Sequence, residues 1–229
     1  MGRSKHYSTS KNSNTLLDLK INNNITNEKN NNLINNQLDK LNPNYISGLT
    51  QSDGSFSCGI SIIKSKKGNK LRFRPKFDLC LDKDSINALN AIKQYFGCGQ
   101  ITNEQPDRSV SFIVSNLKDL KNIIIPHFFN YPVFFNKLHA FQLLVNIVNL
   151  MEDKKEYRDN ATILRSAISM NTASRRTKEQ INILYSIIGI SFDKILPKIP
   201  YNIKTITSKV TTEFIAGMID PIGEMDLFM

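Results

Sequence analysis

Hydrophobic and polar residues alternate with a period of two along residues 55–62 and again along residues 70–81. The apolar positions are Phe56, Cys58, Ile60 and Ile62 in the first run, and Leu71, Phe73, Phe77, Leu79 and Leu81 in the second. Because a strand points alternate side chains to opposite faces, each run is expected to bury one face and expose the other. The residues between the two runs include Lys66–Asn69, a sequence typical of a turn. Together they predict a β-hairpin.

Apolar residues at helical spacing flank this hairpin on both sides. Asn42-Pro43-Asn44 signals the start of a helix that ends at Asp53-Gly54, and Asp84 is expected to cap the next helix. The further expected elements are helices over residues 84–95, 117–129 and 137–151 and strands near residues 98–104 and 108–115. This αββαββα order predicts an α+β fold with its helices on one face of an antiparallel sheet. The other face is expected to be polar and basic.

Composition divides the chain into segments. Residues 1–41 are rich in asparagine and poor in large apolar side chains, so they predict a disordered leader. This leader carries neither the Arg-rich pattern of a transit peptide nor the apolar stretch of a secretory signal, which fits a protein made where it acts. The remaining segments are the α+β unit at 42–152, a helical connection and linker at 153–210, and a further apolar start at 211–229. Within the connection, residues 162–170 and 178–190 predict helices, and residues 197–200 predict an extended stretch.

The overall charge indicates a partner more than a fold. Thirty Lys and Arg residues against twenty Asp and Glu residues give a net charge of +10, which favours a polyanion such as nucleic acid. No apolar run approaches the roughly 20 residues that cross a bilayer, so no membrane partner is expected. The three cysteines, Cys58, Cys80 and Cys98, are too widely spaced for a zinc site and too few for a disulfide framework.

The second strand of the hairpin concentrates positive charge on its polar face. Lys70, Arg72, Arg74 and Lys76 recur at every second residue, about 6.8 Å apart along a strand. Four outward positions of one sign repel each other unless a counter-charge is present. A two-stranded ribbon also fits the major groove of DNA, where Arg and Lys contact guanine edges or phosphates. We therefore interpret this face as a nucleic-acid surface, with a solvated basic sheet face as the alternative.

Two segments share one layout. Tyr45–Phe56 and Phe214–Glu224 each have an apolar start, a small residue followed by glycine, an apolar pair, and an acidic stretch that closes on glycine. The small residues Ser47 and Gly48, and Ala216 and Gly217 in the second copy, would let two helix backbones approach closely. The chain resembles the LAGLIDADG homing endonucleases in these motifs, most closely those encoded by introns of fungal mitochondria. The resemblance covers about Pro43 to the C-terminus.

The resemblance implies an enzyme that cuts double-stranded DNA with Mg²⁺ and acts in the mitochondrion. Asp53 aligns with the essential acid of the first motif, and Asp53, Gly54 and Asp220 are the metal ligands that it implies. Lys137, and less directly Lys83, are implied near the scissile phosphate. The implied DNA contacts are Ser55, Ser57, Lys64, Lys70, Arg72, Arg74, Lys76, Gln100, Ser109 and Ser111. A bias toward Ile, Asn and Lys, whose codons are AT-rich, fits an organellar gene.

The second motif departs from the family pattern. Ile222 occupies the position of its essential acid, and Gln51 replaces the less critical acid of the first motif. Only five residues follow Glu224, so the strands expected after the second motif are absent from this sequence, and a second chain could supply them. Four hypotheses stay open: a homing endonuclease, intact or degenerate; a maturase that binds its host intron RNA; a DNA-binding protein without catalysis; and a basic structural protein.

Overall fold

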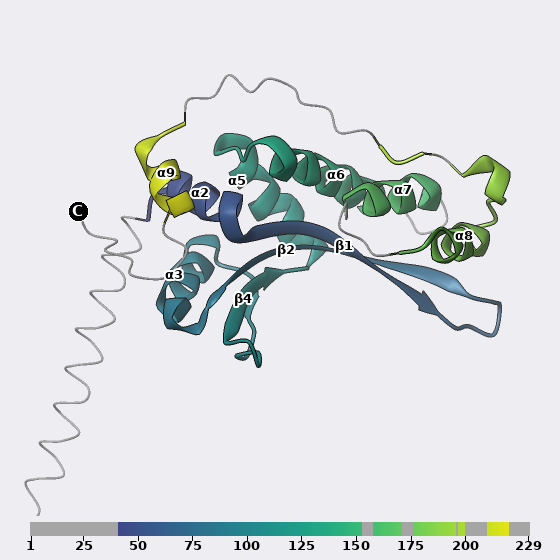
Figure 1. Cartoon of the computed structure of the whole chain (residues 1–229), viewed down its shortest axis with the longest axis horizontal. Coiled ribbons are helices and arrows are strands. Elements are labelled where there is room, and N and C mark those ends of the chain that lie inside the picture. The colour runs from purple at the N-terminus through teal and green to yellow at the C-terminus, as the bar shows by residue number, and fades with distance from the viewer. Residues whose placement is uncertain (1–40, 153–157, 171–175, 196, 200–209, 220–229) are drawn as a thin grey trace, which may run out of the picture. The chain divides into compact units, whose positions relative to one another are not determined.

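A computed structural model of the chain describes residues 41–152, 158–170, 176–195, 197–199 and 210–219 (Figure 1). By its internal contacts the chain divides into two units, Met1–Lys40 and Leu41–Met229, and all described residues belong to the second. Apart from Leu41, which is buried in the core, the predicted leader lies outside the described residues. None of the helices in the described part of the chain is long and apolar enough to cross a membrane.

The described sheet has four antiparallel strands in the order β1-β2-β4-β3. Its strands are β1 (Gly54–Ile63), β2 (Lys70–Asp82), β3 (Gln100–Ile101) and β4 (Ser109–Val114). β1 and β2 form the predicted hairpin, with Gly54 opposite Leu79 at one end and Ile63 opposite Lys70 at the other. Within β2, only the second half, from Phe77 onward, pairs with β4. The hairpin therefore projects beyond the rest of the sheet as a long curved ribbon (Figure 1).

The period-two pattern correctly predicted which face of the hairpin is buried, except near the hairpin tip, where Ile62 is 45% exposed because the covering helices do not bury it. Phe56, Cys58, Phe73, Phe77 and Leu79 are in the core, whereas Arg72 and Arg74 on the opposite face are exposed. Phe77 lies at the centre of an aromatic cluster, with ring centroids 5.4 Å from Phe56 and 5.3 Å from Phe128. Contacts of this kind add to the hydrophobic burial of the rings, so they tie the sheet firmly to its covering helices.

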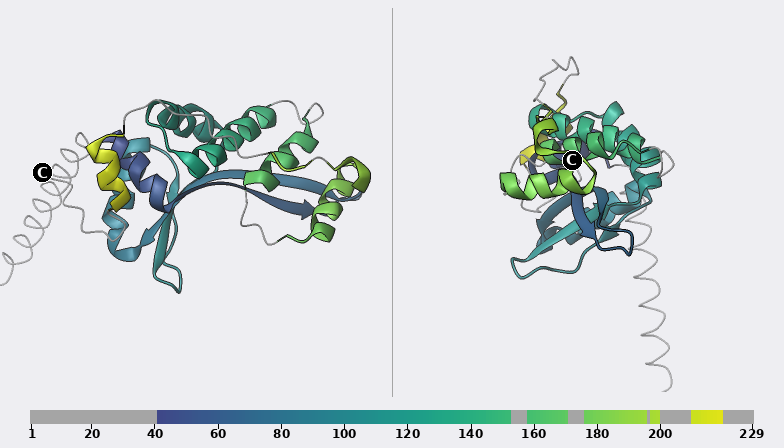
Figure 2. Two further views of the ribbon diagram at one scale, coloured as in Figure 1. Left: turned by 45° about the horizontal axis from the view of Figure 1, so that its top comes forward. Right: turned by 90° about the vertical axis from the view of Figure 1, so that its right-hand side faces the viewer.

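The helices confirm the predicted αββαββα order and continue beyond it. They are α2 (Pro43–Asp53), α3 (Ile86–Phe96), α4 (Leu117–Asp119), α5 (Ile125–Asn130), α6 (Phe135–Glu152), α7 (Asn160–Met170), α8 (Lys178–Ile187) and α9 (Thr212–Ile219). Short turns are η1 (Lys83–Ser85), η2 (Leu120–Ile124) and η3 (Phe192–Lys194). α6 and α7 contact β1 and lie on one side of the hairpin, as both further views show (Figure 2). The predicted extended stretch is described for residues 197–199, which form neither helix nor strand.

Two local predictions were wrong. Asp84 does not cap α3: the N-cap position of α3 is Ser85, whose side chain makes no capping bond, and Asp82 Oδ1 accepts the backbone N–H of Asp84 at 3.0 Å to start the preceding turn η1. β3 was expected over residues 98–104 but has two residues, because Thr102 ends the ladder. The backbone N–H of Thr102 still donates to Ser111, but Ser111 donates back to the Thr102 hydroxyl instead of its carbonyl.

The helix predicted over residues 117–129 is present, but its middle is wider than an α-helix. α4, the π-helical turn η2 and α5 follow one another without a break from Leu117 to Asn130. Asn116 caps its start by accepting the N–H of Lys118 at 2.8 Å. Pro126 lacks an N–H, and its ring would clash with the carbonyl four residues earlier in a regular helix. The π turn immediately before it is a common way to accommodate such a residue.

Candidate acidic site and nucleic-acid interface

Asp53 is the last residue of α2 and stands where the chain passes directly into β1. The N–H of Gly54 donates to the carbonyl of Thr50, which closes the helix. A Cβ on Gly54 would lie 2.5 Å from Cγ2 of Thr50, so only glycine allows this immediate passage from helix to strand. The local sequence Thr50–Gly54 therefore determines that the Asp53 carboxylate lies at the junction of helix and sheet.

One oxygen of the Asp53 carboxylate lacks a hydrogen bond in this position. Its Oδ2 atom is buried and accepts no hydrogen bond from the described residues. A negative charge at a helix C-terminus meets the negative end of the helix dipole, and burying an unpaired carboxylate oxygen carries a desolvation cost. Such an oxygen is well suited to a cation, because a bound cation offsets both unfavourable effects.

Lys137 lies beside Asp53, and its predicted place near a scissile phosphate stays a prediction. It lies in the first turn of α6, and its Nζ donates to the carbonyl oxygen of Gly54. Burial lowers the pKa of the Lys137 ammonium, while the nearby charges of Asp53 and Asp78 act in the opposite direction. Gln51 fixes the approach of this segment, since its Oε1 accepts the N–H of Phe134 at 2.8 Å. Gln51, which replaces the less critical acid of the first motif, thus has a structural role.

Asp78 is a member of this cluster that the sequence reasoning missed. It lies on β2 opposite Ser55, so it shares the polar face one strand away from the end of α2. Its Oδ1 is 2.9 Å from Nζ of Lys76, and its charge acts on Lys137. The signal was present in the alternating pattern, because Asp78 ends the run of four basic residues on that face. Only the strand register places it beside the Asp53 end of the sheet.

The expected DNA-contacting residues on the strands share one face. The register pairs Ser55 with Asp78, Ser57 with Lys76, and Gly59 with Arg74. Ser111 and Ser109 of β4 lie opposite Cys80 and Asp82 on the same face, and Gln100 of β3 lies opposite Ile113. Lys64 is exposed just after β1, and Lys70, Arg72 and Arg74 are exposed along β2. One continuous polar face therefore runs from the Asp53 end of the sheet to the hairpin tip.

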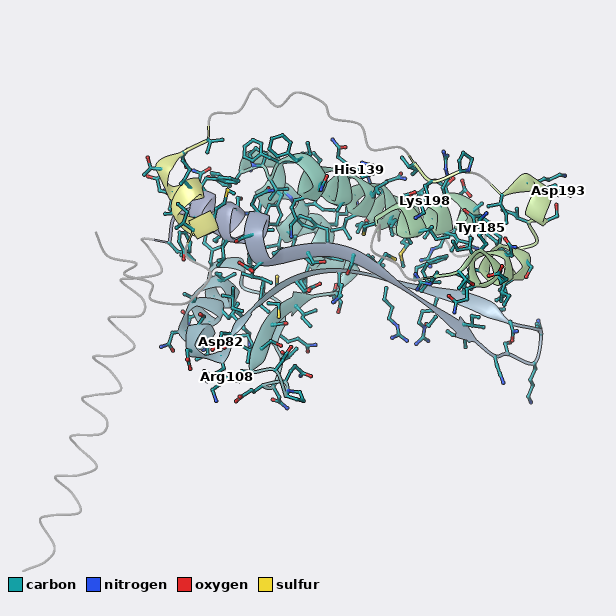
Figure 3. The ribbon with its side chains drawn as sticks, in the orientation of Figure 1. Asp82, Arg108, His139, Tyr185, Asp193 and Lys198 are labelled. Carbon is teal, nitrogen blue, oxygen red and sulfur yellow. The ribbon has the colours of Figure 1, made fainter. Side chains whose placement is uncertain are left out.

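Lys83 is not brought to this site. It follows the far end of β2, five residues beyond Asp78, where its Nζ pairs with Glu104 at 3.1 Å. Next to it Arg108 bridges Asp82 and Asp84 at 3.3 and 2.8 Å, and Figure 3 shows Asp82 and Arg108 together at this corner of the sheet. Hydrogen bonding to the backbone of Asp84 and the charge of Arg108 lower the pKa of Asp82. Lys83 is therefore part of a surface ion-pair network.

The two motif copies do pack closely, and their glycines mark the closest approach. A Cβ on Gly48 would lie 1.9 Å from the carbonyl oxygen of Phe214, and one on Gly217 would lie 2.2 Å from that of Tyr45. Both distances are far below any allowed contact, so the helices α2 and α9 meet backbone to backbone. The other two predicted interface residues are placed differently. Ser47 is buried but hydrogen-bonds to Tyr131, away from α9, and Ala216 is exposed.

Ser47 belongs to a buried polar network on the other side of α2. Its hydroxyl donates to the carbonyl of Tyr131 at 2.6 Å and lies 3.4 Å from Nε2 of His127. With that proton committed, Ser47 can only accept from His127, so Nε2 is the protonated nitrogen of the ring and Nδ1 accepts from the Tyr95 hydroxyl at 3.3 Å. Burial lowers the pKa of His127 to about 4. The imidazole is therefore neutral and structural near pH 7.

The described residues contain no cluster of three His, Cys, Asp or Glu side chains that would hold a metal by themselves. They do offer the Asp53 oxygen described above, and Mg²⁺ commonly binds one or two carboxylates and completes its shell with waters and substrate phosphates. Asp53 fits such a site as one ligand. Asp220 and Ile222 lie outside the described residues, so their positions relative to Asp53 remain predictions.

Comparison with known proteins shows what the αββαββα part of the chain is similar to. Residues 46–148 match the family model described as LAGLIDADG endonuclease. A probable intron-encoded DNA endonuclease of Mycosarcoma maydis is 26% identical over 188 residues, which are 80% of this chain and 67% of the relative. The homing endonuclease I-ApeII of Aeropyrum pernix is 26% identical over 61% of this chain and 86% of its own length.

Solved structures agree with this result. The LAGLIDADG homing endonuclease I-GzeII, solved in complex with its DNA target, is 28% identical with a TM-score of 0.58, and the match covers 79% of this chain and 58% of that one. I-SmaMI, bound to uncleaved DNA in the presence of calcium ions, has a TM-score of 0.62 at 24% identity and supports the fold. The chain spans less than three fifths of both structures, and about a quarter of a 32% identical probable intron-encoded endonuclease of Neurospora crassa.

Proposed function

We propose that the chain is a LAGLIDADG endonuclease, whose family model matches its residues 46–148, and that it is a site-specific endonuclease of the homing type that cuts double-stranded DNA. The basic face of the β1–β2 hairpin contacts the duplex. The Asp53 end of the same face carries the hydrolytic chemistry. The matched relatives are intron-encoded or homing endonucleases, which supports this assignment.

One observation carries the proposal. The buried, unpartnered oxygen of Asp53 lies at the end of a polar face whose exposed cations are Lys70, Arg72 and Arg74. A structural carboxylate would normally be paired, so its exception at the border of a basic surface indicates a cation-dependent reaction on a polyanion. The tight packing of α9 on α2 further indicates that the end of α2 is held in a defined place.

We propose Mg²⁺ as the metal, with Asp53 as a ligand and Gly54 and Asp220 as further predicted ligands. When bound, such a metal activates water and stabilises the leaving oxygen of a phosphodiester. Lys137 adds a positive charge beside Asp53, fixed by its bond to the Gly54 carbonyl. A preorganised ammonium at this point stabilises the negative charge that develops on the scissile phosphate. Asp78 holds Lys76 at the same end of the sheet.

The biological setting is part of the proposal. Curated relatives include intron-encoded proteins, one of them an uncharacterised protein in ND4 intron 1 of Podospora anserina, 29% identical over 119 residues. We therefore propose that the gene lies in a mitochondrial intron and that the protein acts in the mitochondrion. We also propose that full double-strand cleavage uses a second αββαββα unit, because the matched structures are longer than this chain. Such a unit could come from a second chain.

A second candidate function is binding without cleavage, either to DNA or, as a maturase, to the host intron RNA. Ile222 favours it, because isoleucine at the position of the second essential acid cannot hold a metal. In that case the basic face would bind nucleic acid while Asp53 took no part. The substitution Asp53→Asn distinguishes the two functions.

The decisive experiment is Asp53→Asn, assayed on duplex DNA that carries the joined exons flanking the intron. The wild-type chain is expected to nick or cut this DNA only with a divalent cation. The cleavage rate of the variant should fall by more than about 100-fold. Even mutation of residues that only hydrogen-bond to metal ligands lowers metal affinity or activity by about 10–100-fold. The DNA affinity of the variant should stay intact. Asp193→Asn, an exposed carboxylate on η3, is the control and should cut normally.

Two results would contradict the cleavage proposal. Tight, specific binding without any strand scission under Mg²⁺, Mn²⁺ or Ca²⁺ would leave only the binding function. Faster splicing of the intron RNA that is unaffected by Asp53→Asn would identify the maturase instead.

A further inference from the structure

The two strands of the hairpin present very different side chains on the polar face. β1 contributes Ser55, Ser57, Gly59 and Ser61, and β2 contributes Lys70, Arg72, Arg74 and Lys76. The β1 side chains are too short to reach the floor of a DNA groove, while the β2 side chains span several ångströms beyond the sheet. The longest side chains that this hairpin offers to the bases are therefore those of β2.

The four cations of β2 are not equivalent. Lys76 is held by Asp78 at 2.9 Å, so its charge is already neutralised within the protein. Arg72 and Arg74 are exposed, and neither forms an ion pair within the described part of the chain. Arginine also differs from lysine in its planar fork of donors, which matches the O6 and N7 acceptors of guanine. The two arginines are thus the side chains on this strand best suited to read bases.

Their surroundings on β1 leave them unobstructed. Arg74 lies opposite Gly59, which is exposed and has no side chain to compete for the guanidinium. A Cβ on Gly59 would lie 3.7 Å from Cβ of Arg74, an ordinary contact, so the fold does not require glycine there. Arg72 lies opposite Ser61, whose hydroxyl oxygen is buried and bonds to none of the described residues. Neither arginine therefore has a carboxylate opposite it or a side-chain hydrogen bond to its partner across the ladder.

The register also sets a scale. Arg72 and Arg74 are two residues apart, or about 6.8 Å along a strand, and successive base pairs are about 3.4 Å apart. Gly59 is five residues and Ser61 seven residues from Gly54, so the two arginines lie about 17 and 23 Å from the Asp53 end of the sheet. A ribbon that follows the groove therefore places them about two base pairs from each other, and about five and seven base pairs from the cleaved bond.

We propose that Arg74 and Arg72 determine specificity by each reading one guanine, with the two guanines two base pairs apart and the Arg74 guanine nearer the cleavage position. This inference rests on the proposed function, because it assumes that the polar face enters the major groove. Lys76 is excluded from this reading by Asp78, and Lys70 at the hairpin end contributes charge without base preference. Each bidentate contact is expected to favour guanine over other bases by about tenfold or more.

The test is selection of bound duplexes from a randomised library by the full chain without Mg²⁺, followed by sequencing. The wild-type protein should enrich guanine at two positions separated by one base pair. Arg74→Ala should remove the preference at the position nearer the cut, and Arg72→Ala the preference at the farther one. Lys70→Ala, the control, should weaken binding to all sequences alike and leave both preferences in place.

Two variants of Gly59 test the role of Arg74 without changing Arg74 itself. Gly59→Asp would place a carboxylate opposite Arg74, where cross-strand pairs interact, and should abolish the nearer guanine preference. Gly59→Asn has almost the same shape without the charge and should retain that preference. The variants share a fold-tolerant position, so a difference between them reports on the pairing of Arg74.

The possible failures are distinguishable. Specific binding whose preferred sequence lacks guanine at two such positions, or is unchanged by both Arg→Ala variants, would overturn the inference and leave the proposed function standing. Loss of guanine preference at both positions from a single variant would also overturn it, because the two readings would not be separate. Absence of any enriched sequence would contradict the proposed function itself.

Discussion

The two copies of the motif, α2 and α9, have the same layout in sequence and very different surroundings in the fold. Aligned from Tyr45 and Phe214, their first and fourth positions are buried in both, since these positions form the contact between the helices. The positions between and after them diverge. Ile46 is fully buried, whereas the isoleucine at the same place in α9, Ile215, is 46% exposed.

The divergence has a simple cause. α2 continues directly into β1 and also packs against the sheet, so its remaining side chains enter the core of the unit. α9 contacts α2, and Phe214 packs edge-to-face with Phe134 at a centroid distance of 4.9 Å, but the outer side chains Ile215, Met218 and Ile219 are exposed. A motif of this kind therefore determines one helix contact. How much of the rest of the helix is buried depends on the elements that pack around it.

The largest expected effect is a difference in stability between alanine variants of the two equivalent isoleucines, Ile46 and Ile215. Ile46→Ala should lower the free energy of unfolding by about 2–5 kcal/mol, because it leaves a cavity in the core. Ile215→Ala removes the same atoms from a half-exposed site and should change stability by less than about 0.5 kcal/mol. Urea unfolding followed by circular dichroism measures both. Equal losses would show that α9 is as deeply buried as α2 in solution.

The next effect depends on the buried network behind Ser47, a position that α9 fills with the exposed Ala216. His127 has a pKa of about 4 in the folded chain and about 6.5 when unfolded. As the pH falls from 6.5 to 4, the unfolded chain gains a proton that the folded chain does not, so stability decreases by up to about 3 kcal/mol. Above pH 6.5 this contribution is complete and constant.

Comparing urea midpoints at pH 7 and pH 4.5 checks this expectation. His127→Gln should flatten the difference, because glutamine keeps hydrogen-bonding capacity but does not titrate. His139→Gln is a second variant, and because burial also lowers the pKa of His139, it too should reduce the acid sensitivity. An unchanged acid sensitivity in His127→Gln would contradict a neutral buried imidazole.

The smallest of the three effects concerns the contact that both helices share. Gly48→Ala would bring a methyl group against the Phe214 carbonyl and should loosen α9, at a cost of about 1–3 kcal/mol. Gly217→Ala should do the same from the other side. Hydrogen exchange of the α9 amides, with Gly59→Ala as a control at an open position, measures the loosening. Unchanged protection of α9 in both variants would mean that the close packing is absent in solution.

Several features of the fold follow from local sequence alone, and each has a local physical cause. Asn42 accepts the N–H of Asn44 at 2.9 Å and begins α2 where the Asn-Pro-Asn signal predicted. The period-two pattern predicted the buried face of the hairpin, because alternation is a property of any strand. The caps and ends that failed, at Asp84 and in β3, depended on competition between neighbouring polar groups. Asp82 is as well suited to cap as Asp84, and Thr102 substitutes a hydroxyl for its own carbonyl.

The candidate site divides in the same way. The sequence by itself determined that an acidic residue ends the first motif helix, that β2 carries a basic stripe, and that glycines mark the helix contact, because these depend on short-range periodicity and side-chain size. Only the tertiary structure decided that Lys137 lies beside Asp53 and that Lys83 pairs with Glu104 in a separate ion-pair network. These contacts join residues 84 and 21 positions apart. They depend on strand register and on the packing of α6 against the sheet, which leave no periodic trace in the chain.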